Sequence, residues 1–511
     1  MSTTQQNNKR IAKNTLLLYI RMLFMMAVSL YTSRLVLDIL GEVNFGIYNV
    51  VGGFVTMFAV ISGAMTTATQ RFLSFEIGKG SQGNVHSLFS TAVMIHVILA
   101  GIILVLAETI GLWFLNTQMN FPPERHTAAN WVYQFSVLTF LINVISVPYN
   151  AAIVAYEKMT AFAYVSIIEV ILKLVVVYLL IVSPFDQLIV YSILLAIIAI
   201  TIRVIYGIYC GRNFKDCHCD WKWNKTEGKQ MMSFVSWNLI GSVAGIAKEQ
   251  GINVVLNIFF GAAINAARGV AYQVFGALNS FVNNFQLAMN PQIVKQYAAG
   301  NKSDMFLLVF RGSKFSFLLL WTLSLPVILE APFILSIWLK AVPQYTVIFL
   351  RLVLITALID SLSGTLISSM HASGKVRDYQ IVVGGLSLLT LPVAYIFFKL
   401  GYPPQTAMAV SVVISIVCYF ARMLLLNRTI KLPVKEYLWS VTLKIVIVAA
   451  VSLLLPLFAY LSFSSGWQSF ITVCTLSVVS TCSISYVIGL SKRERAFFNK
   501  KIHDIIIKIR K

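Results

Sequence analysis

Charged side chains inside long apolar segments are the residues of this sequence with the clearest potential for chemistry. A charge at the centre of a bilayer costs roughly 2.5–3.5 kcal/mol or more, so such residues usually line a substrate or ion path. The basic ones, within these segments or at their ends, are Arg21, Arg34, Lys173, Arg203, Lys248, Arg268, Arg351, Arg422 and Lys444. The acidic ones are Asp38, Glu108, Glu169, Glu249, Glu330 and Asp360. Together they indicate a polar interior inside a membrane protein.

Several of these charges need no ligand to explain them. A long side chain near the end of a membrane segment can reach water, which applies to Glu330, Arg351, Arg422 and Lys444. Opposite charges four residues apart on a helix can neutralise each other, as in the pairs Arg34–Asp38 and Glu169–Lys173.

Four basic residues have no obvious partner on their own helix: Arg21, Arg203, Lys248 and Arg268. Unpaired cations inside a membrane favour an anionic substrate, and the fork of donors on arginine matches phosphate. Buried carboxylates are the usual carriers in proton or sodium coupling. We therefore take Asp38, Glu249 and Asp360 as candidates for ion coupling.

Two consecutive segments, 234–258 and 264–288, carry polar stripes at helical spacing. The first stripe is Ser242, Glu249, Asn253 and Asn257, and the second is Arg268, Tyr272, Asn279, Asn283, Gln286 and Asn290. One face of each helix is then polar through most of the bilayer, which predicts a water-filled cavity. The alternative is that these groups only tie helices together by hydrogen bonds.

The composition predicts an all-α, polytopic membrane protein. Of the 511 residues, 58% are hydrophobic and 12% are charged, against about 25% charged in soluble domains. Segments of about 20–27 residues match a bilayer core of about 30 Å. We expect about fourteen spans, near 14–40, 45–68, 87–114, 129–153, 160–182, 188–210, 234–258, 264–288, 312–337, 346–369, 379–399, 405–426, 438–461 and 468–489.

The distribution of basic residues predicts the orientation. With the N-terminus in the cytoplasm, 28 of the 40 Lys and Arg lie in cytoplasmic segments and three lie outside. This asymmetry places both termini in the cytoplasm. It also accounts for the formal net charge of +21, so we expect no nucleic-acid partner.

Motifs of other function classes are missing from the sequence. It has no phosphate-binding glycine loop, and the short outer segments leave no room for a catalytic domain. Cys210, Cys217 and Cys219 cluster near one cytoplasmic loop, but without a standard zinc spacing, and we assign them no role. We expect neither a metal nor another cofactor.

Glycines repeat at a fixed offset and suggest an internal duplication. Gly41 is matched by Gly261, and Gly80 by Gly300, both 220 residues later. We expect two six-helix lobes in the same orientation, as in parallel-repeat transporters. The expected division is an N-lobe at 1–210, a cytoplasmic linker at 211–233, a C-lobe at 234–426, a helix pair at 427–490 and a basic amphipathic tail at 491–511.

The opening KRIAKNTLLLYIRMLFMMAVSLYTSRLVLDILGEVNFGIYNVVGGF and the later RFLSFEIGKG resemble bacterial polysaccharide-biosynthesis flippases. These belong to the multidrug/oligosaccharidyl-lipid/polysaccharide exporter (MOP) superfamily, and the resemblance is sharp over residues 9–80. It implies a transporter, not an enzyme, in the bacterial inner membrane. Such a flippase moves undecaprenyl-pyrophosphate-linked oligosaccharide (O-antigen, capsule or exopolysaccharide units) to the periplasmic leaflet by alternating access, with ion coupling expected.

On this resemblance the substrate would be bound by Arg21, Arg34, Lys248, Arg268, Asn279, Asn283 and Arg203. Arg21 and Arg34 are similar to first-helix basic residues of related flippases, with Lys248 and Arg268 as their second-lobe complement. The implied partners of a monomer are lipid-linked oligosaccharide, membrane lipids and a polysaccharide polymerase machinery. The alternative is a cation-coupled multidrug or small-molecule exporter of the same superfamily, whose cavity should favour carboxylates.

Overall fold

The computed structural model describes residues 3–56, 59–117, 123–221, 223–339, 342–464, 466–491 and 494–496. These residues form helices and connecting turns, and none of them lies in a β-strand. A helix satisfies its backbone hydrogen bonds within one segment, as the interior of a bilayer requires. The predicted all-α class is confirmed.

The chain divides into two compact units. Unit 1 comprises Met1–Val243 and Asn290–Lys302, and unit 2 comprises Ala244–Met289 and Ser303–Lys511. The chain therefore changes unit inside two long helices, α8 (Lys225–Phe260) and α9 (Ala262–Ala298).

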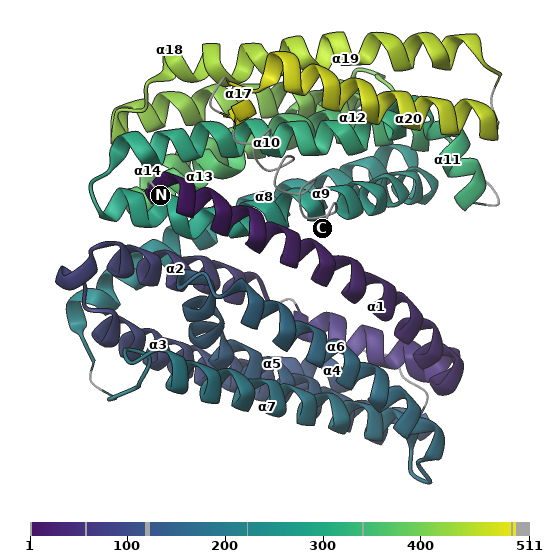
Figure 1. The fold of residues 1–511 in the computed structure, drawn as a ribbon. Coiled ribbons are helices and arrows are strands. Elements are labelled where there is room, and N and C mark those ends of the chain that lie inside the picture. Colours follow the sequence, from purple (N-terminus) through teal and green to yellow (C-terminus); the bar gives the residue numbers. More distant parts are fainter. Residues whose placement is uncertain are drawn as a thin grey trace, which may run out of the picture. The chain divides into compact units, whose positions relative to one another are not determined.

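Unit 1 is a bundle of long helices, in which α5 packs against α2, α3 and α7, and α1 packs against α6 (Figure 1). A π-helical turn, Ala107–Gly111, joins α3 to the short α4. The helices are α1 (Thr3–Thr56), α2 (Ala59–Gly78), α3 (Val85–Leu106), α4 (Leu112–Thr117), α5 (His126–Ala155), α6 (Met159–Val182) and α7 (Gln187–Asn213).

Unit 2 contains the remaining helices, several of them interrupted by short turns. They are α10 (Lys302–Leu329), α11 (Ala331–Trp338), α12 (Thr346–Ser361), α13 (Ser363–Ser373), α14 (Arg377–Tyr379), α15 (Gly385–Leu388), α16 (Thr390–Lys399), α17 (Thr406–Ile430), α18 (Val434–Tyr437), α19 (Leu443–Ser462) and α20 (Trp467–Ile484). An apolar core from α8, α9, α11, α12, α16 and α17, including Leu256, Ala267, Phe349 and Phe398, holds the helices of the candidate site together.

Within the described ranges, nine helical stretches are long and apolar enough to cross a membrane, and the bent pair α12–α13 would be a tenth. These ten correspond to the predicted spans 3–6 and 9–14. The predicted spans at 234–258 and 264–288 are helical too, in α8 and α9, but are not among the nine because their sequences carry the polar stripes. Helices α1 and α2 cover the first two predicted spans.

The four glycines of the predicted repeat all have a positive φ. Gly41 and Gly261 have φ of 73° and 79°, and Gly80 and Gly300 have φ of 62° and 77°. Gly41 breaks the helical path inside α1, and Gly261 separates α8 from α9. Since glycine adopts positive φ without strain, the matched glycines mark equivalent breaks in the two halves, which supports the predicted repeat.

Replacing Gly41 by alanine should destabilise the protein. Its backbone (φ 73°, ψ 166°) lies in a region essentially restricted to glycine, at a cost of about 1–3 kcal/mol for other residues. We expect a lower melting temperature for the Gly41→Ala protein in detergent. The matched control is Gly63→Ala in α2, where an added Cβ would meet no atom within 4 Å. Equal melting temperatures for the two variants would contradict the expectation.

Candidate functional site

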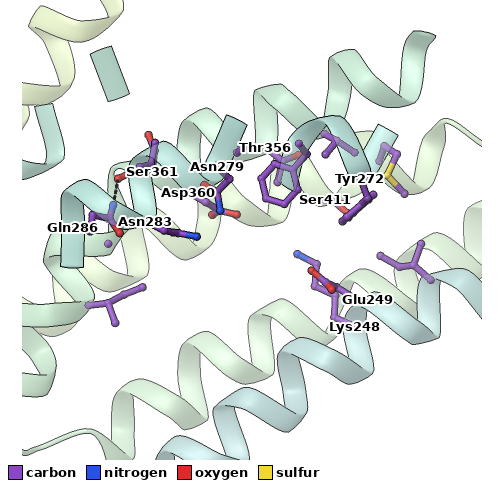
Figure 2. Close-up of a pocket in the computed structure, with 18 residues that line it drawn as sticks. Lys248, Glu249, Tyr272, Asn279, Asn283, Gln286, Thr356, Asp360, Ser361 and Ser411 are labelled. Atoms are coloured by element: carbon purple, nitrogen blue, oxygen red, sulfur yellow. Dashed lines mark hydrogen bonds between the residues drawn. The ribbon is translucent and has the colours of Figure 1, made fainter. Parts of the chain in front are cut away.

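Unit 2 contains a cavity of about 300 Å³ between α8, α9, α12, α13 and α17. Figure 2 shows polar side chains from these helices directed toward the same space. The polar and charged lining residues are Lys248, Glu249, Tyr272, Asn279, Asn283, Gln286, Thr356, Asp360, Ser361 and Ser411.

Helix α8 contributes two neighbouring charges, Lys248 and Glu249, to the cavity wall (Figure 2). Among the residues that the structure describes, neither forms an ion pair within 4.0 Å. Helix packing alone therefore gives no reason for an ammonium and a carboxylate at this place. Both are available to a ligand or an ion.

Helix α9 contributes a row of side chains at spacings of seven, four and three residues: Tyr272, Asn279, Asn283 and Gln286. Gln286 is committed to the protein, since it donates to the Ser316 hydroxyl (3.2 Å) and the Ser361 carbonyl (3.3 Å). The amides of Asn279 and Asn283 have no such hydrogen bond to the described chain. Each can donate to and accept from a ligand in the cavity.

Asp360 on α12 is contacted by two side chains that do not line the cavity. It accepts a hydrogen bond from the Ser415 hydroxyl (2.8 Å) and lies 3.9 Å from a guanidinium nitrogen of Arg422. The Arg422 side chain is 13% exposed and also donates to Ser363 (2.8 Å) and Tyr379 (3.1 Å). The expectation that the Arg422 side chain extends to cytoplasmic water is wrong. Its guanidinium instead bonds to two hydroxyl groups within the protein and lies near the Asp360 carboxylate.

The charge on the cavity wall is mixed. The lining has one ammonium, Lys248, and two carboxylates, Glu249 and Asp360, with Arg422 behind Asp360. The cationic excess counted over all spans is therefore not a property of this lining. What distinguishes the cavity is a set of uncommitted amides next to unpaired charges.

The family described as polysaccharide biosynthesis protein matches residues 11–296, more than half of the chain. The chain belongs to this family. The resemblance inferred from residues 9–80 is thereby confirmed. No curated protein sequence matches the chain.

The fold of this polysaccharide biosynthesis protein is similar to that of solved MOP-superfamily transporters. The bent form of the Vibrio cholerae MATE transporter VcmN has a TM-score of 0.72 at 15% identity, covering 86% of this chain and 100% of its own. An outward-facing multidrug resistance MATE family transporter has a TM-score of 0.69 at 13% identity, and the match covers 83% of this chain and 96% of that transporter. A Pyrococcus furiosus MOP-superfamily transporter, whose binding pocket is described as reversed in polarity, has a TM-score of 0.65 at 13% sequence identity. The match covers 82% of this chain and 96% of that transporter.

Five of the residues predicted from sequence meet at the cavity: Lys248, Glu249, Asn279, Asn283 and Asp360.

Arg268, on the same helix as the asparagines, does not line the cavity. It is 4% exposed, its guanidinium lies 4.1 Å from the centre of the Tyr272 ring, and it donates to Asn253. Its Nε and Nη2 atoms have no hydrogen-bond partner in the described chain.

The other predicted residues belong to unit 1. The guanidinium of Arg21 lies over Phe162 (4.3 Å), and that of Arg203 over Tyr149 (3.7 Å). Asp38 is exposed on α1. The Arg34 side chain lies outside the described residues. Whether these four residues take part in binding stays a prediction.

Sequence reasoning missed the hydroxyl residues Thr356 and Ser411, which line the cavity, and Ser415, which donates to Asp360. A usable signal was present, because Ser411 and Ser415 lie four residues apart in the mostly apolar stretch of α17 that precedes Arg422. Small hydroxyls are common at helix contacts in membranes, so this spacing alone would not have distinguished lining from packing.

A Cβ at Gly364 should disturb the cavity floor. It would overlap the amide group of Gln286, which would have to give up its bonds to Ser316 and Ser361. We expect Gly364→Ala to lower the free energy of unfolding by about 1–3 kcal/mol, the usual cost of stranding buried polar groups. Gly385→Ala is the matched control, because an added Cβ there meets no atom within 4 Å. An unchanged melting temperature for Gly364→Ala would contradict this expectation and would mean that Gln286 can move without a loss of stability.

Proposed function

We propose that this protein is a flippase for undecaprenyl-pyrophosphate-linked oligosaccharide. It would move the repeat unit from the cytoplasmic to the periplasmic leaflet of the bacterial inner membrane by alternating access. Two findings support the proposal: the match of residues 11–296 to the polysaccharide biosynthesis protein family, and a cavity with uncommitted amides on a MOP-type fold. The observation that carries it is the free amide pair Asn279 and Asn283 beside Lys248.

The cavity chemistry suits a sugar headgroup. Sugar hydroxyls both donate and accept hydrogen bonds, and each asparagine amide offers both functions. A sugar chain cannot cross hydrocarbon unaided, because every unpaired hydroxyl costs several kcal/mol. At about 300 Å³ the cavity is at the lower end of the range for ligand sites, so it would hold part of an oligosaccharide at a time.

The pyrophosphate would be bound by cations. Lys248 faces the cavity and supplies a mobile ammonium, which suits phosphate as a point charge. Arg21, Arg34, Arg203 and Arg268 remain proposed contacts, to be used as the headgroup moves. For Arg268, the two unpartnered guanidinium nitrogens support this role. We keep the predicted orientation, with both termini in the cytoplasm.

Ion coupling is proposed to act through Glu249 and Asp360, with Asp38 as a further candidate. Glu249 has no ion-pair partner in the described chain, and the Asp360 side chain is 47% exposed. Carboxylates with this access can exchange protons or sodium.

A cation-coupled multidrug or small-molecule exporter is the second candidate. One observation favours it: two of the three charged groups in the cavity lining are carboxylates, which suit cationic drugs. The uncommitted amides favour the sugar substrate instead.

The proposed function is tested by measuring lipid-linked oligosaccharide in each membrane leaflet of cells that lack the protein and have no second flippase. We expect accumulation in the cytoplasmic leaflet and loss of surface polysaccharide. Normal protein should restore both, and Lys248→Ala or Asn279→Ala/Asn283→Ala protein at equal abundance should restore less than about a tenth, as expected when contacts worth about 1.4 kcal/mol or more are lost. Lys399→Ala, at an exposed position, is the control.

An unchanged leaflet distribution in cells without the protein would remove the flippase proposal. Loss of resistance to cationic drugs in the same cells would then favour the exporter.

The coupling carboxylates have their own prediction. In vesicles with an imposed proton or sodium gradient, transport by the Glu249→Gln or Asp360→Asn protein should no longer respond to the gradient, because an amide cannot release a proton or bind sodium as a carboxylate does. Glu436→Gln, at an exposed carboxylate in the same unit, should keep the response. Full gradient dependence in both cavity variants would exclude these residues as coupling sites.

A further inference from the structure

The segment between α7 and α8, of which residues 214–221 and 223–224 are described, is bound to α3 and to the end of α5 in unit 1. Its Asp220 carboxylate is 2.8 Å from His86 Nε2, and the Ser90 hydroxyl donates to the His218 carbonyl (3.1 Å). The Phe214 ring stacks on Tyr156 with centroids 4.3 Å apart. The contacts reach the first turns of α3 and the end of α5, and α5 packs against both α3 and α7 (Figure 1).

The acidic groups of this region each have a partner within unit 1, although Asp216 and Asp220 are exposed. Asp216 accepts a hydrogen bond from the Tyr156 hydroxyl (3.1 Å), and burial together with this carboxylate raises the pKa of Tyr156. Glu227, in the first turn of α8, accepts from Ser87 (2.8 Å) and Thr91 (3.3 Å). With Asp220 bound to His86, each carboxylate of the segment and of this turn has an internal partner.

Both tryptophans and three lysines of this region are exposed. Trp221 is 66% exposed and Trp223 is 46% exposed. Lys215, Lys225 and Lys229 are exposed, and none forms an ion pair with a described carboxylate. We call these five residues the linker face.

The linker face is fixed in shape rather than loose. Trp221 has φ of 54°, a left-handed conformation that is strained for a bulky residue and persists only where the surroundings enforce it. The Trp223 ring packs directly on Gly228, where a Cβ would clash with it. Asn224 caps α8 by accepting from the backbone N–H groups of Thr226 (3.1 Å) and Glu227 (3.2 Å).

The linker face adjoins the ends of two candidate membrane spans, a position that would place it near a membrane surface. It follows directly after α7, a candidate span that ends at Asn213, and it is docked on α3, a candidate span that starts at Val85. Tryptophan is enriched at the headgroup level of membranes, and each lysine near an anionic leaflet adds attraction to it.

We propose that the linker face binds anionic phospholipid headgroups of the adjacent leaflet, with Trp221 and Trp223 inserted at headgroup depth and the three lysines contacting phosphates. This lipid contact would fix the first turn of α8, the helix that carries Lys248 and Glu249. It does not depend on which substrate the cavity takes.

The test uses the full-length protein in vesicles whose lipids carry bromine near the headgroup, which quenches tryptophan fluorescence. The fluorescence quenching that comes from the linker face is the difference in tryptophan quenching between the normal protein and the Trp221→Ser/Trp223→Ser protein. We expect this difference to be at least roughly twofold larger with phosphatidylglycerol than with phosphatidylcholine alone, and to shrink in high salt. In Lys215→Gln/Lys225→Gln/Lys229→Gln protein, the dependence on phosphatidylglycerol should disappear.

The matched control is Trp113→Ser/Trp467→Ser, which removes two other exposed tryptophans. This pair should change the quenching equally in both lipids. Melting temperatures of all variants in detergent show whether they fold. A Trp221/Trp223 contribution quenched by acrylamide in water and not by the brominated lipid would overturn the proposal and leave the surface to a protein partner. Equal quenching in both lipids would also overturn it.

Discussion

The cost of placing charged and amide groups in an apolar phase is the constraint on which the rest of this structure depends. An isolated buried charge is strongly unfavourable, whereas a paired and hydrogen-bonded one is tolerated. In each unit, charged groups are paired within the unit. Lys173 and Glu169 are 2.6 Å apart in unit 1, and Arg422 is bound by two hydroxyls near Asp360 in unit 2. Polar groups without such partners therefore stand out, and in unit 2 several of them, Lys248 and Asn279 among them, line one cavity.

Fold class and cavity position were largely predictable because both rest on local sequence signals. Apolar runs of sufficient length predict helices whatever their neighbours are, and the 220-residue glycine offset reports a backbone requirement that no other residue meets easily. The stripe in α9 predicted four lining residues, Tyr272, Asn279, Asn283 and Gln286. Of the described side chains in the α8 stripe, Glu249 alone lines the cavity.

The positions of Arg268 and Arg422 could not be predicted, because periodicity tells which residues share a face and not what that face meets. Long side chains on a helix lean toward its N-terminus, so Arg268 leaves the asparagine row and reaches Asn253 on the preceding helix. Arg422 finds Asp360 and Ser363, more than 50 residues away in sequence. Such pairings depend on helix arrangement, which a single sequence does not reveal.

The mixed charge of the cavity has a consequence for an anionic substrate. Glu249 and Asp360 would repel a pyrophosphate in so small a space unless each is protonated, or binds a cation, when the headgroup arrives. Substrate and ion would then favour each other's binding, and by linkage the coupling is equal in both directions. Lys248, which pairs with neither carboxylate in the described chain, would attract the pyrophosphate directly. The balance between one ammonium and two carboxylates would thus set how strongly ion binding controls substrate binding.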